Sequence, residues 1–156
     1  MAQPDLPAIA LEALRGLLED AMARLPGEPV VRVSSPWQGP EHGLFVHLYD
    51  IAGRDPAATA EPRWRLRLLI GAFAATDLDV HRLMGHASAA LLARPRIEAD
   101  DMAAAATRLN LPEPPPAGLH ARLGAEALSI DDMTRLWRRF APMRYSLSSG
   151  WRLEIA

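Results

Sequence analysis

The side chains best suited to catalysis or metal binding are five histidines, but their spacing argues against a metal site. His81 and His86 lie five residues apart in a segment with helical periodicity, so they point to different sides of a helix. Zinc on one helix requires ligands three or four residues apart, and no H-E-x-x-H motif is present. His42 precedes a candidate strand and His47 lies on it, where we expect a hydrogen-bonded core or interface histidine. The sequence therefore predicts no metal and no cofactor.

Nucleophiles and paired acids give no better candidate for catalysis. The serines of "YSLSSG" have no G-x-S-x-G frame, and their segment alternates like a regular strand rather than a sharp turn. The acid pairs Asp100/Asp101 and Asp131/Asp132 lie where helix N-caps are expected, with Asp100 as the predicted cap of its helix. No cysteine is present, which excludes disulfides and thiolate chemistry. We predict that the protein is not an enzyme, and a hydrolase of unrecognised type ranks last among the alternatives.

Arginines form the most distinctive pattern in the chain. In "RWRLRLLI", Arg63, Arg65 and Arg67 alternate with apolar residues, which predicts a strand with one core face and one basic face. Two interpretations remain open for this basic face. The arginines are solvated or paired with the domain's own carboxylates, or they form a charge-complementary contact with a protein partner.

The same two interpretations apply to Arg138 and Arg139 in a later helix. Nucleic acid is a weaker candidate partner, because the net charge is −2 and no aromatic stacking pattern accompanies the arginines.

The elements that position these side chains follow from periodicity. Apolar residues at intervals of three or four predict helices. Segments that are bounded by Pro or Gly and in which apolar and polar residues alternate predict strands. The helices are expected over 5–25, 78–94 with Thr76 or Asp77 as N-cap, 99–110, and from Ser129 to just before Pro142. The strands are expected over 30–35, 44–51, 63–73, 119–128 and 145–155. The strand over 44–51 carries bulky residues on both faces, which favours a central strand covered on both sides.

This order of elements predicts an α+β fold in which about three or four helices pack on a mainly antiparallel sheet of about four to six strands. A length of 156 residues suits a single domain, 1–156. No segment approaches the roughly eighteen apolar residues of a membrane span, and Asp5 and Glu12 interrupt any signal-peptide pattern. We expect no membrane partner and a cytoplasmic location.

Several blocks, taken in order, carry a family resemblance. They are "LYDI", "PRWRLRLLIGAFA", "HRLMGHASAALLARP" and "MTRLWRRFAPMRYSLS", and they span most of the chain. Together they resemble the small cap or tail-terminator proteins of contractile injection systems, which are phage-tail-like particles. The positions that match the family pattern are Pro62, Leu66, Leu68, Leu69, Phe73, Leu83, Met84, Gly85, Leu91, Pro95, Leu136, Trp137, Arg144 and Ser146. One departure is the run Ser148, Ser149 and Gly150 before Trp151, so the last strand is expected to be shifted, bulged or differently paired.

The resemblance implies a non-enzymatic hexameric ring, part of an assembled particle, that binds the distal end of the inner tube and the last sheath layer and so stops elongation. Its partners would be further copies of itself, the inner tube protein and the sheath protein. Under this hypothesis the contacts come from the basic strand, the loop 53–61 and the terminal helix-strand unit. The interface residues are then Arg63, Arg65, Arg67, Arg138, Arg139, Arg144 and Ser146. The alternative is a stand-alone adaptor domain that binds a protein or peptide through its sheet edge.

Overall fold

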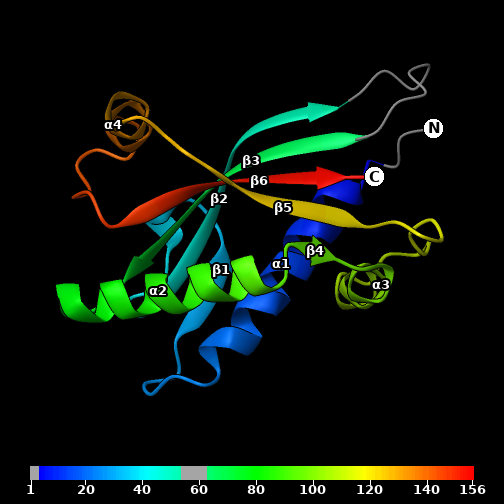
Figure 1. The fold of residues 1–156 in the computed structure, drawn as a ribbon, viewed down its shortest axis with the longest axis horizontal. Helices are drawn as coiled ribbons and strands as arrows, with labels where there is room; N and C mark the ends of the chain where they lie inside the picture. The colour runs from blue at the N-terminus through cyan, green and yellow to red at the C-terminus, as the bar shows by residue number, and fades with distance from the viewer. Residues whose placement is uncertain (1–3, 54–62) are drawn as a thin grey trace.

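The protein is built on one six-stranded sheet that carries helices on both faces (Figure 1). This computed structural model describes residues 4–53 and 63–156. The helices are α1 (Leu6–Met22), α2 (Asp77–Ala93), α3 (Ala99–Arg108) and α4 (Ile130–Arg138), with a short 3-10 turn η1 (Pro36–Gln38). The strands are β1 (Val30–Val33), β2 (Gly43–Gly53), β3 (Trp64–Phe73), β4 (Arg96–Ile97), β5 (Ala121–Glu126) and β6 (Ser148–Ile155).

The strand order across the sheet is β1-β2-β3-β6-β5-β4. Only β1 and β2 run parallel, and the other described pairs are antiparallel. The predicted α+β class with a mainly antiparallel sheet is confirmed. The two-residue strand β4 was not predicted, because it is too short to show any periodicity. It and the four-residue β1 form the two edges of the described sheet.

The larger hydrophobic core lies between one face of the sheet and helices α1, α2 and α3. Leu66, Leu68 and Ile70 of β3 point into it, as the alternation predicted, together with Trp151, Leu153 and Ile155 of β6. The last strand is thus fastened at the centre of the sheet. The residue that follows the strand is held as well, since Ala156 and His120 exchange two backbone hydrogen bonds.

A second, smaller cluster lies on the opposite face, beneath α4. Phe45 and Leu69 of the sheet pack there against Leu136, Trp137 and Phe140. The aromatic rings meet edge to face, with centroids of Trp137 6.0 Å from Phe45 and 5.5 Å from Phe140. The first half of β2 is therefore covered on both sides, as expected, whereas its second half from Asp50 to Gly53 is exposed.

Helix starts follow their capping residues, with one correction. The Thr76 and Ser129 hydroxyls accept hydrogen bonds from the backbone N–H groups of Asp79 and Asp132, as predicted for α2 and α4. The prediction of Asp100 as the cap of α3 is wrong. Glu98 occupies the N-cap, and the Asp101 carboxylate accepts from its N–H at 3.3 Å, so the helix starts two residues earlier than that prediction requires.

The last strand is regular, contrary to the expectation of a shift or bulge. β6 pairs with β3 in one continuous register from Trp64 opposite Ile155 to Gly71 opposite Ser148. The irregularity lies instead in β2, where Tyr49 is the extra residue between Leu48 and Asp50.

Two glycines let the covered face of the sheet pack closely. A methyl group on Gly71 would overlap the Phe45 ring, and one on Gly150 would lie 2.6 Å from the carbonyl oxygen of Glu126. In the Ser148 to Gly150 run, where the resemblance leads one to expect an aromatic, Gly150 therefore leaves space for the Leu128 side chain, and Ser148 lies beside Trp137 of α4.

Candidate protein-binding surfaces

The half of the second sheet face that α4 leaves uncovered carries a ladder of opposite charges. Arg65 Nε lies 3.2 Å from a Glu154 carboxylate oxygen, and Arg67 Nη2 lies 3.1 Å from Glu126. Arg152 shares Glu154 at 3.4 Å. The predicted basic face exists, but two of its three predicted arginines are paired with the domain's own carboxylates. This is the first of the two interpretations left open by the sequence.

Arg67 is held more firmly than a typical surface arginine. Its guanidinium also lies over the Tyr49 ring, 5.3 Å from the centroid. The hydrogen bond to Glu126 raises the pKa of Arg67, and burial raises the pKa of Tyr49 while the neighbouring Arg67 charge opposes that rise. Exposed ion pairs of this kind contribute about 0–1 kcal/mol each. Their main effect here is to hold the guanidinium in one place.

The arginines of α4 present charge more freely. Arg135, Arg138 and Arg139 are exposed, and none forms an ion pair within the part of the chain that the structure describes. Two of them lie in the last turn of α4, where positive charge also stabilises the helix dipole. Arg139 and Arg135 share a hollow of about 290 Å³ with Arg67 and Tyr49, so the structure brings the basic strand and the basic helix together.

His47 lies beside this hollow. Its ring packs edge to face on Phe140 at 5.1 Å, and its pKa is lowered by burial and by the nearby Arg139 charge. His47 is thus partly buried, as a core position requires, but the predicted hydrogen bond of its ring is not found within the described residues.

An apolar groove of about 610 Å³ runs along the other side of α4. Its lining is Leu128, Ser129, Ile130, Met133, Thr134, Trp137, Arg138, Ala141, Met143 and Tyr145. Ile130 is 86% exposed and Tyr145 is 59% exposed, so apolar surface is offered to solvent there. We call this feature the α4 groove.

The remaining predicted interface residues separate into different roles. Arg63 and Arg144 are exposed. Ser146 instead stabilises the fold, because its hydroxyl donates to the Ala72 carbonyl oxygen at 2.6 Å. Ser148 is buried, and its Oγ accepts from Trp137 Nε1 at 3.0 Å. The loop 53–61 lies, apart from Gly53, outside the described residues.

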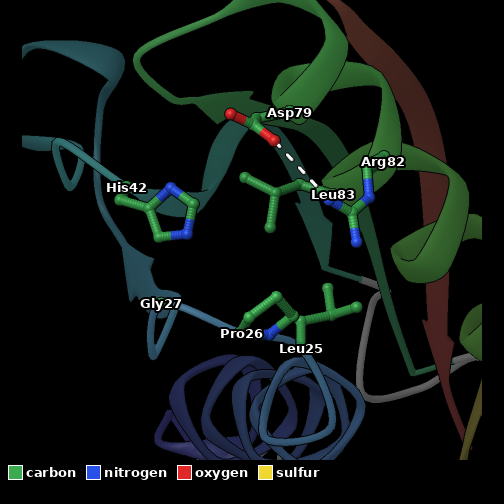
Figure 2. A pocket seen from close by; sticks show the side chains of 7 residues that line it. All are labelled: Leu25, Pro26, Gly27, His42, Asp79, Arg82 and Leu83. Atoms are coloured by element: carbon green, nitrogen blue, oxygen red, sulfur yellow. Dashed lines mark ion pairs between the residues drawn. The ribbon is translucent and has the colours of Figure 1, made fainter.

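A smaller cavity of about 220 Å³ lies between the end of α1 and the start of α2 (Figure 2). Leu25, Pro26 and Leu83 form its apolar part, and Asp79 and Arg82 pair across 3.8 Å at its mouth. His42 Nε2 is buried there without a hydrogen-bond partner in the described residues, close against Gly27. Because this nitrogen is inaccessible, the side chains that a ligand would meet are apolar ones and the Asp79–Arg82 pair, whose charges cancel.

Within residues 4–53 and 63–156, no three His, Asp or Glu side chains are grouped so as to hold a metal ion. In the same residues, no helix combines the length and apolar character needed to cross a membrane.

Sequence reasoning missed the features that come from long-range pairing. Glu126 and Glu154 lie 59 and 89 residues from the arginines they bind, and no local pattern connects them. The α4 groove was also missed. A detectable signal was Ile130, which follows the helical spacing of Met133 and Trp137 but is 86% exposed.

Comparison with known proteins gives agreement at the level of fold. No family model matches this sequence, and no curated protein sequence matches it either. Similar solved structures include the sheath/tube terminator of an extracellular contractile injection system, PVC, in its extended state, and the tube terminating cap of the anti-feeding prophage.

The first comparison has a TM-score of 0.58 at 15% identity over 92% of this chain, and the second has 0.58 at 16% identity over 99%. This chain spans about half, 54%, of each of those proteins. The resemblance inferred from the ordered sequence blocks is therefore confirmed as a shared fold.

Proposed function

We propose that this chain is a structural terminator of a contractile injection system, which binds the end of the inner tube and sheath and stops their elongation. The observation that carries the proposal is the shared fold, which extends over nearly the whole chain to two proteins described as a terminator and a terminating cap. Residues 1–156 would form one terminator domain, acting as a closed ring in an assembled particle. The proposed ring contains six copies of the chain.

The surfaces support a role based on contact rather than on chemistry. A terminator needs one surface complementary to a growing end and rigid scaffolding behind it. The described residues offer exposed arginines on α4, an apolar groove beside them and a sheet packed on both faces. This role depends on surface charge and shape, and we propose no catalytic residue.

Deleting the gene tests the function directly. Particles from cells lacking the protein should show uncontrolled tube and sheath lengths in electron micrographs, and reintroducing the gene should restore a uniform length. Unchanged length distributions in the deletion strain would refute the terminator role.

Charge reversal separates the candidate contact surfaces. Because Arg65 and Arg67 are paired internally whereas Arg138, Arg139 and Arg144 are exposed, we expect Arg138→Glu/Arg139→Glu/Arg144→Glu to abolish capping of isolated tubes. We expect Arg63→Glu/Arg65→Glu/Arg67→Glu to weaken it less. Tube-end occupancy in micrographs is the measurement, and circular dichroism controls for folding. If the strand variant loses capping and the α4 variant keeps it, the contact surface is the strand face.

The alternative of a stand-alone adaptor is favoured by one observation, the exposed α4 groove. An adaptor would not bind tube ends and would stay monomeric or dimeric, so the same micrographs distinguish the two functions.

A further inference from the structure

We propose that the α4 groove receives the first turn of α2 from a second copy of this chain, with Leu78 inserted into the groove and Asp77 beside the groove's arginines. The proposal rests on the proposed function only for the closure of such contacts into a ring. The pairwise contact itself is derived from the two surfaces.

The groove is apolar inside and basic at one end. Met133, Trp137 and Met143 line it, and Arg138 contributes to the wall. Arg144 lies between Met143 and Tyr145, two lining residues, and is exposed. The acidic residues Asp131 and Asp132 lie at the opposite end of the helix, in its first turn. A matching partner therefore carries an apolar side chain next to negative charge.

The chain itself presents such a segment at the start of α2. Leu78 is 70% exposed, although a leucine in an amphipathic helix is normally turned towards the core. Among the large apolar side chains exposed in the described residues, Leu78 alone has a carboxylate residue on each side, Asp77 and Asp79.

Helix capping accounts for one of these two carboxylates better than for the other. Asp79 accepts a hydrogen bond from the Thr76 hydroxyl at 2.8 Å and lies 3.8 Å from Arg82. Asp77 is exposed and has no ion pair within the described part of the chain. Both acids stabilise the α2 dipole, but that effect does not require an exposed leucine between them.

The arrangement of the two surfaces favours a contact between copies. α2 packs on the face of the sheet that carries the larger core, whereas α4 lies against the other face (Figure 1). The sheet thus separates Leu78 from the groove of the same chain. One copy can place its α2 on the α4 of the next, and repeating this head-to-tail contact gives a closed ring if the rotation closes.

Sedimentation of the purified chain measures the self-association that this contact would produce. Burying one leucine contributes enough that Leu78→Asp should weaken self-association roughly tenfold or more. Leu92→Asp is the matched control, since Leu92 is 67% exposed on the same helix but has no acidic neighbour. Asp77→Arg and Arg138→Asp should each weaken association, and the double variant should regain most of it. Because Leu78, Asp77 and Arg138 are exposed, we expect all variants to fold.

Disulfide trapping tests the same contact in assembled particles. The chain contains no cysteine, so Asp77→Cys/Arg138→Cys introduces the two thiols of interest alone. Oxidation should give covalent multimers on non-reducing gels, whereas Leu92→Cys/Arg138→Cys should stay monomeric.

Several outcomes would overturn the contact. The first is a wild-type chain that is monomeric in solution and, in the cysteine variant, forms no disulfide-linked multimers in particles. The second is a Leu78→Asp variant that associates like wild type. The third is a Met133→Asp variant that loses tube binding but not self-association. The last result would assign the groove to a tube or sheath protein. In each of these cases uncontrolled particle lengths in the deletion strain would still support the terminator function, so the two proposals fail separately.

Discussion

At the scale of single residues, Glu12 forms two ion pairs, one with Arg15 and one with Arg108. Its carboxylate lies 2.7 Å from Arg15 in α1 and 2.8 Å from Arg108 in α3, so it links two helices that pack on the same sheet face. Hydrogen bonding to Arg15, with a further contribution from Arg108, lowers the pKa of Glu12 to about 2, although partial burial acts in the opposite direction. Charge-assisted hydrogen bonds of this kind contribute more than ordinary surface pairs.

We predict that Glu12→Gln lowers the free energy of unfolding at pH 7 by about 1 kcal/mol. A carboxyl whose pKa is lower in the folded state stabilises the protein above its unfolded pKa of about 4.5, and this contribution is lost as the pH falls towards 2. Urea unfolding at pH 7, 5 and 3 should therefore show a difference between variant and wild type that shrinks with acidity. Glu19→Gln, which removes an exposed partner of the same arginine, is the control and should change stability little. A difference that stays constant with pH would contradict this assignment.

At the scale of elements, α4 is held to the sheet by a few large side chains. Trp137 is 6% exposed, and its indole N–H donates to the Ser148 hydroxyl inside the smaller cluster. The serine run before Trp151 thus supplies the hydrogen-bond partner that a buried indole requires.

We predict that Trp137→Phe and Ser148→Ala each destabilise the fold and are coupled. In a double-mutant cycle, the interaction energy should be about 1 kcal/mol, because the second change removes a hydrogen bond that the first has already broken. Thermal or urea unfolding of the four proteins gives this energy. Strictly additive effects would show that the hydrogen bond contributes nothing to anchoring α4.

At the scale of the whole molecule, the two faces of the sheet have unequal cores. The larger cluster contains residues of three helices and the central strands, whereas the smaller one consists of five buried residues, two of which belong to α4. Elements with few buried contacts open at lower free energy than the global transition.

We therefore expect the amides of α4 to exchange with solvent faster than those of α1 and β6 in native-state hydrogen exchange. The Ser129 cap accepts from only one amide of the first turn of α4, that of Asp132. Protection in α4 equal to that in α1 would mean that the two cores unfold as one unit.

The sequence predicted the elements well where local chemistry decides them. The alternation of Arg65, Leu66 and Arg67 gave the correct strand and the correct core face, and the Ser129 cap placed the start of α4. Pairing between distant segments was not predictable, because β3 lies next to β6 only through contacts made across the whole chain. For the same reason the partners of Arg65 and Arg67 were unknown, and the bulge at Tyr49 was expected in the wrong strand.

The candidate site was predicted in part. Arg138 and Arg139 are exposed as the contact hypothesis requires, whereas Ser146 serves the fold by binding Ala72. A hydroxyl in a strand-like segment looks the same in sequence whether it faces a partner or a backbone carbonyl.

The two sheet edges, four-residue β1 and two-residue β4, have a further consequence. Long unpaired edges act as templates on which other chains add strands, whereas short edges offer few backbone groups for such pairing. At β1 and β4 themselves, edges this short therefore disfavour amyloid-like polymerisation.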